Sequence, residues 1–169
     1  MGAILTTTNP TGSLSCEGVN FNTAAWGIFE DLTVLLAPSE FRGSSITVPH
    51  QDGRVPVPVR IDEATFEFKF PVAGDFDASG VAYADPVQGF VSNLFALRAV
   101  TDPPGIAAPV TRDVVYTVPG YGTATAACQL FLDATAELKI GTETQFGRPA
   151  ALKRCLLRVR CPDGLFTLD

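Results

Sequence analysis

Apolar and polar residues alternate strictly along residues 65–70, which read TFEFKF. Successive side chains of a β-strand point to opposite faces, so the three phenylalanines share one face and Thr65, Glu67 and Lys69 share the other. The alternation predicts a strand with one face in the core, and therefore a fold built on a β-sheet.

Strand patterns return after residue 105 and continue to residue 169. We expect strands at residues 112–118, 123–133, 134–140, 151–161 and 165–168. Within residues 151–161, alternation places Cys155, Leu157, Val159 and Cys161 on one face and Arg154, Arg158 and Arg160 on the other. We expect these arginines to pair with carboxylates, either within the subunit or across an interface.

One helix is predicted, at about residues 86–100. Asp85 can cap the first free backbone amides, and Pro86 suits the first helical position. Apolar residues follow at three- and four-residue spacing: Val87, Phe90, Val91, Leu94 and Leu97. A mainly β chain with one inserted helix indicates a β-sandwich or barrel with one flanking α-helix.

Length and charge limit the class of protein further. The 169 residues predict one domain, which we place at residues 16–169, after a flexible N-terminal arm at residues 1–15. A net charge of −6 disfavours a nucleic-acid-binding face and attraction to an anionic membrane. The composition, 46% hydrophobic and 18% charged, fits either a dense β core or apolar surface covered by partners.

The residues offer little for catalysis or for cofactor and metal binding. No phosphate-binding glycine motif and no GxSxG occurs, and His50 is the single histidine. Residues 74–80 resemble a calcium loop, but Pro86 stands where the last ligand, a glutamate, belongs. We expect no enzyme, no cofactor and no metal site. The four cysteines (Cys16, Cys128, Cys155 and Cys161) lack zinc-ligand spacing, so we expect buried free thiols.

A segment rich in glycine and proline, residues 42–59, precedes the phenylalanine strand. Residues 46–48 predict a brief strand, and residues 51–53 a tight turn. Residues 55–59 alternate valine with proline, which predicts an edge strand or a polyproline-like stretch because proline cannot donate to a ladder.

Short motifs in and around this segment follow one another in a recognisable order. They are Leu35, Pro38, Arg42-Gly43-Ser44, Val48-Pro49, Gly53-Arg54, Arg60, Asp62, Gly74, Asp77-Ala78-Ser79-Gly80, Tyr83-Ala84-Asp85-Pro86, Gly89, Asn93-Leu94 and Leu97-Arg98-Ala99. Over roughly residues 18–140 this order and spacing resemble the small tail proteins of long-tailed phages that infect actinobacteria.

The resemblance implies the tail-tube fold, a β-sandwich flanked by a helix, and assembly into hexameric rings around a lumen. It implies a structural virion protein of the tail-tube or distal tail type, assembled in the bacterial host cytoplasm, with itself and adjacent tail proteins as partners. DNA would pass through the lumen without specific binding, and no membrane partner is implied. We expect residues 42–59 to be the assembly loop, with these residues at the subunit interface: Arg42, Ile46, Val48, His50, Arg54, Val55 and Val57.

An alternative is a ligand-binding β-sandwich, for example a carbohydrate-binding module. Trp26, Tyr83, Tyr116 and Tyr121 would then form an aromatic platform. The sequence is poor in tryptophan and tyrosine, which disfavours this alternative, and a glycan screen would test it.

Overall fold

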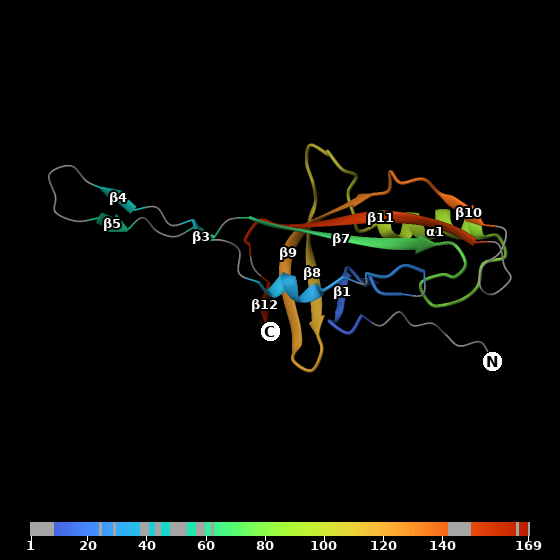
Figure 1. Cartoon of the computed structure of the whole chain (residues 1–169), viewed down its shortest axis with the longest axis horizontal. Helices are drawn as coiled ribbons and strands as arrows, with labels where there is room; N and C mark the ends of the chain where they lie inside the picture. Colours follow the sequence, from blue (N-terminus) through green and yellow to red (C-terminus); the bar gives the residue numbers. More distant parts are fainter. Residues whose placement is uncertain are drawn as a thin grey trace.

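The computed structural model of the protein describes residues 9–23, 25–28, 30–37, 41–42, 45–47, 54–56, 60–61, 63–141, 150–164 and 166–168. In the strands between residues 41 and 61 the description covers the backbone. The chain is mainly β with one α-helix, as predicted, and its main sheet curls into a half-barrel (Figure 1).

The main sheet is antiparallel and its strands pair in an order that differs from their order in the chain. The path runs β10 (Lys139–Gly141), β11 (Ala150–Cys161), β9 (Gly122–Asp133), β8 (Thr111–Val118), β1 (Ser13–Cys16) and β2 (Val19–Asn20). In addition, β7 (Ala64–Ala73) pairs with β11, and β12 (Thr167–Leu168) pairs with the end of β9. The predicted strands after residue 105 are confirmed, except for the one at residues 134–140.

The phenylalanine strand is β7, and it lies in the core as predicted. It pairs with β11 from Ala73 opposite Leu152 to Ala64 opposite Cys161. Phe68 and Phe70 are fully buried and Phe66 is partly buried, while Glu67 and Lys69 on the other face are exposed. Burying each phenylalanine side chain stabilises the fold by about 1.5–3 kcal/mol.

A short segment, residues 21–28, connects the two ends of the curled sheet. At one end the Phe21 amide donates to the Leu14 carbonyl of β1 (2.8 Å). At the other end the Ala73 amide of β7 donates to the Ala25 carbonyl (2.8 Å), and Trp26 bridges to Val72. Trp26 is buried and belongs to the hydrophobic core.

The helix α1 (Pro86–Arg98) starts where predicted, with the Asp85 carboxylate accepting from the amides of Val87 and Gln88. It packs against β7 and β11. The approach is close because two glycines meet: a Cβ on Gly89 would lie 2.3 Å from the Gly74 carbonyl oxygen. No side chain fits there without displacing backbone, so the glycine pair sets the position of the helix.

The N-terminal region differs from the sequence-based expectation. Residues 9–15, which we predicted as part of an arm, belong to the fold: Asn9 is buried and donates to the Ile28 carbonyl (3.0 Å), and β1 pairs with β8. β1 and β2 form a hairpin through Glu17 and Gly18, which both have positive φ as two-residue hairpin turns require. Residues 1–8 lie outside the described residues.

One other prediction needs correction. The strand predicted at residues 134–140 is reduced to β10, and Ala136, which alternation along such a strand would place inward with Leu138, is exposed. Residues 32–36 form a 3-10 helix, η1 (Leu32–Leu36), in which Leu32 and Leu35 are buried but Val34 is exposed.

Candidate functional site

The described strands between residues 41 and 61 pair with one another, and we call residues 41–61 the hairpin arm. β3 (Phe41–Arg42) pairs with β6 (Arg60–Ile61), and β4 (Ser45–Thr47) pairs with β5 (Arg54–Pro56). Within the described part of the chain, each pair forms a two-stranded sheet of its own. Figure 1 shows β4 and β5 at the left end of the molecule, away from the main sheet.

The register of the hairpin arm changes between its two ladders. In the first ladder Arg42 lies opposite Arg60, and in the second Ser45 lies opposite Pro56.

Four of the seven predicted interface residues lie on strands of the hairpin arm. Arg42 is on β3, Ile46 is on β4 directly opposite Val55 on β5, and Arg54 is opposite Thr47. The other three lie outside the described residues: Val48, His50 and Val57.

The structure adds Arg60 to this set, a motif residue that was not predicted at the interface. It lies on β6 directly opposite Arg42 on β3.

The hairpin arm differs in charge from the remainder of the chain. It holds three arginines and one aspartate, a net charge of +2, in a chain whose total is −6. The remaining residues therefore carry −8. A basic extension on an acidic body is electrostatically complementary to the body of another copy.

A second feature is an exposed apolar stripe on α1. Val87, Val91 and Phe95 recur every fourth residue on one side of the helix, and 38%, 43% and 70% of their surfaces are exposed. The spacing of apolar residues predicts Val87 and Val91 on the buried face of the helix, and this prediction is wrong. The buried face consists of Gly89, Phe90, Asn93 and Leu97. Asn93 is covered because its amide donates to the carbonyls of Ala73 and Phe76.

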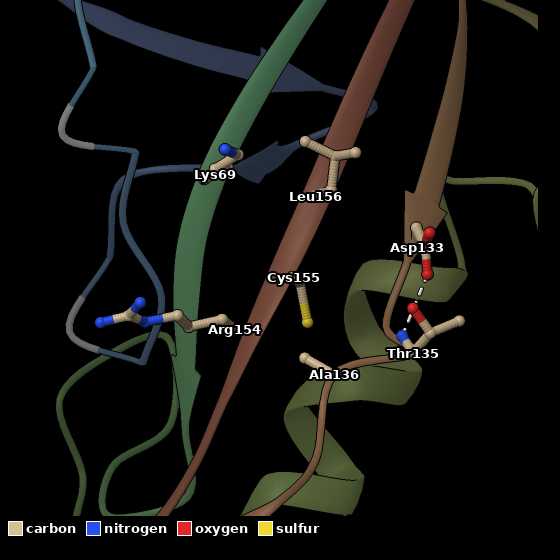
Figure 2. A pocket seen from close by; sticks show the side chains of 7 residues that line it. All are labelled: Lys69, Asp133, Thr135, Ala136, Arg154, Cys155 and Leu156. Atoms are coloured by element: carbon tan, nitrogen blue, oxygen red, sulfur yellow. Dashed lines mark hydrogen bonds between the residues drawn. The ribbon is translucent and has the colours of Figure 1, made fainter.

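A surface hollow of about 190 Å³ lies where β7, β9 and β11 meet (Figure 2). Its lining residues are Lys69, Asp133, Thr135, Ala136, Arg154, Cys155 and Leu156. The Asp133 carboxylate accepts from the Thr135 amide (3.0 Å). Burial raises the pKa of Cys155 to about 11, so its thiol is protonated at neutral pH and is a poor nucleophile.

Two of the three arginines on the outer face of β11, Arg158 and Arg160, pair with carboxylates within the subunit, one of the two arrangements expected. Arg158 contacts Glu67 at 2.7 Å, and Arg160 binds Glu63 through two nitrogens, at 2.5 and 2.6 Å. The bonds from Arg160 lower the pKa of Glu63. Among the described residues no group of three His, Cys, Asp or Glu side chains is placed to hold a metal ion.

Compared with known protein families and with curated proteins, the chain matches none of them. None of the described helices has the length and apolar character needed to cross a membrane. The hairpin arm and the stripe on α1 are therefore interpreted from their geometry and chemistry.

Proposed function

We propose that this protein is a structural subunit that assembles with copies of itself into a ring, the hairpin arm reaching a neighbouring subunit. The observation that carries the proposal is the pairing of the arm, whose two ladders join no other described strand. A two-stranded ribbon is only marginally stable in water, and its edges expose unpaired backbone donors and acceptors. Contact with a neighbour would stabilise the ribbon and pair those groups.

Charge supports a second copy of the chain as the partner. Arg42 and Arg60 lie directly opposite each other, and like charges in this position destabilise a ladder. A carboxylate-rich surface on the neighbour would neutralise them. The residues outside the hairpin arm, with a net charge of −8, supply carboxylates in excess.

The exposed stripe on α1 supports assembly independently of the hairpin arm. Phe95 is 70% exposed, and it extends a row of exposed apolar side chains that also includes Val87 and Val91. Removing apolar surface from water is favourable by about 25 cal/mol per Å², before the costs of association are subtracted. We propose that a neighbouring subunit covers this stripe in the ring.

We further propose that the ring belongs to the tail of a long-tailed phage, at the level of the tail tube or the distal tail. The motif order described above supports this assignment, and a half-barrel with one helix is compatible with the fold that the resemblance implies. On this proposal the ring is hexameric, DNA passes through its lumen, adjacent tail proteins stack on it, and it is found in virions after assembly in the host cytoplasm.

The aromatic residues expected to form a carbohydrate-binding platform do not share an exposed surface. Trp26 is 3% exposed and Tyr116 is fully buried, with its hydroxyl donating to the Thr11 carbonyl. Tyr121, which is 85% exposed, lies at the turn between β8 and β9. These aromatic side chains do not form one exposed surface, so no observation favours glycan binding.

The deciding experiment replaces residues 43–59 by Asn-Gly. Because Arg42 and Arg60 are directly opposite, a two-residue turn of this type closes β3 on β6 without strain. We expect rings or tubes of the unaltered protein by mass photometry and electron microscopy, and monomers of the shortened protein with an unchanged circular dichroism spectrum.

A matched control keeps the hairpin arm and changes another exposed turn. Tyr121→Ser removes an exposed aromatic side chain from the β8–β9 turn and should assemble like the unaltered protein. Rings that survive removal of the arm would contradict its assigned role, and an unaltered protein that stays monomeric at high concentration would contradict the proposal as a whole.

A further inference from the structure

Two of the four free cysteines lie on neighbouring strands and point into the core. Cys128 is on β9 and Cys161 is the last residue of β11; they are 0% and 1% exposed. Both positions follow the alternation of their strands, in which every second residue is buried. The two thiols therefore project from the same face of the sheet.

The register places these cysteines directly opposite each other. Gln129 pairs with Arg160, so the next position along the antiparallel ladder brings Cys128 opposite Cys161. Directly opposite residues have neighbouring side chains. Their thiols are close enough to form a hydrogen bond with each other.

The type of pair can be derived from the hydrogen bonds of β9. The Asp102 amide donates to the Leu130 carbonyl (2.7 Å), and the Leu132 amide donates to the Asp102 carbonyl (3.0 Å). Asp102 lies on the edge of β9 opposite to β11, so the backbone N–H and C=O groups of Leu130 and Leu132 point away from β11. Cys128 is two residues before Leu130, so its backbone groups point away from β11 as well. Cys128 and Cys161 thus form a non-hydrogen-bonded pair, for which Cα atoms lie about 4.5 Å apart, within the 4.4–6.8 Å range of disulfides.

We propose that Cys128 and Cys161 form a disulfide when the protein meets an oxidising environment. The proposal does not depend on the role of the hairpin arm. The other cysteines are excluded by position. Cys155 lies six residues from Cys161 on the same strand, about 20 Å away. Cys16 on β1 is separated from Cys128 by β8, which alone puts about 9–10 Å between their strands, and the register aligns Cys16 with Ala126 and not with Cys128.

Formation of this disulfide requires an external oxidant, and a small disulfide such as oxidised glutathione can act as that oxidant. One cysteine thiolate attacks a sulfur of this oxidant, forms a mixed disulfide and releases one glutathione thiolate. The second cysteine, after losing its proton, displaces the other glutathione thiolate and completes the bond. Two protein thiols are thereby oxidised, one oxidised glutathione is reduced to two glutathiones, and two protons are transferred.

The surroundings make this reaction slow in the folded state. The hydrogen bond with Cys161, together with burial, raises the pKa of Cys128, so little thiolate is present. Cys161 ends β11 and is followed by a turn, in which the Gly164 amide donates to the Cys161 carbonyl (3.1 Å). Opening of this strand end is the step that admits the oxidant.

The test treats the purified full chain with oxidised glutathione, with and without a low urea concentration that promotes opening. We expect the intact mass to fall by about 2 Da, since two hydrogens are removed, and one disulfide-linked peptide pair containing Cys128 and Cys161. The melting temperature should rise by roughly 10 °C, because the bond closes a long loop in the unfolded chain.

Four single variants provide the controls. Cys128→Ser and Cys161→Ser should both abolish the linked peptide and the rise in melting temperature, whereas Cys16→Ser and Cys155→Ser should retain them. Three results would overturn the proposal: a bond between other cysteines, stable glutathione adducts without an internal bond, or four free thiols after oxidation in urea followed by refolding.

Discussion

Arg42 on β3 and Arg60 on β6 lie directly opposite each other at the base of a two-stranded ribbon. Like charges directly opposite each other destabilise a ladder. This ribbon has no other strand beside it among the described residues. The pair therefore weakens this end of the ribbon unless an acidic surface neutralises it.

Arg60→Glu should therefore stabilise the ribbon and weaken assembly. The substitution turns a repulsive cross-strand pair into an attractive one, but it lowers the net charge of the hairpin arm from +2 to zero. We expect weaker association by mass photometry at low salt. Association should also depend less on salt than in the unaltered protein, because screening acts on exposed charges.

The matched control is Arg154→Glu, which makes the same charge change at an exposed position of β11. It makes the body more acidic and should leave association unchanged or strengthen it. An equal loss of assembly in both variants would indicate a general charge effect and would contradict the role given to the hairpin arm.

Val91→Ser and Val34→Ser form a matched pair that tests the stripe on α1. The two valines are similarly exposed, at 43% and 41%, but only Val91 belongs to the stripe. Each substitution should change the free energy of unfolding by less than about 0.5 kcal/mol, as is usual at exposed positions. Only Val91→Ser should weaken ring formation, measured by sedimentation velocity across a concentration series.

Phe95→Ser should have a larger effect than Val91→Ser, because it removes the most exposed side chain of the stripe. Equal assembly of the Val91, Phe95 and Val34 variants would show that the stripe is not covered in the ring.

The sequence predicts a strand or helix well where the residues of that element alone determine its conformation and its buried face. The alternation around Phe68 and Phe70 identifies β7 and its buried face, and capping by Asp85 locates the start of α1. It does not predict that β7 pairs with β11, because that register depends on packing between residues about ninety positions apart. It also does not distinguish Phe90, which is buried, from Val91, which is exposed.

The candidate site shows the same division. The glycines and prolines of the hairpin arm indicate an unusual segment in the sequence. Arg60 becomes part of the candidate site only when its pairing with Arg42 is known. The face of α1 that stays exposed is decided by the contact between Gly74 and Gly89, which leaves no trace in hydrophobic periodicity.

Gly89→Ala should destabilise the protein although alanine favours helices. In a free helix this change contributes about 1 kcal/mol of stability. Here the added Cβ would lie 2.3 Å from the Gly74 carbonyl oxygen and 2.4 Å from the Tyr83 ring. Overpacking against backbone typically costs about 1–3 kcal/mol, so the midpoint of urea unfolding should fall. Gln88→Ala, at an exposed neighbouring position, should leave that midpoint nearly unchanged.

Burial of the thiols predicts how stability depends on alkaline pH. Burial raises the pKa of Cys155 from 9.0 to about 11, so the thiol stays protonated in the folded protein while it ionises in the unfolded chain. Its contribution to stability is fully present below pH 9 and is lost as the pH rises toward 11. Between these values the free energy of unfolding should fall by about 1.4 kcal/mol per pH unit for this thiol.

Urea unfolding in a reducing agent at several pH values measures this slope. Cys155→Ala should make the decline between pH 9 and 11 shallower by the contribution of one thiol, with a constant offset for the lost side-chain packing. Cys16→Ala should have a similar effect, because burial also raises the pKa of Cys16 to about 11. Parallel curves for the unaltered protein and both variants would mean that neither thiol is kept protonated by the fold.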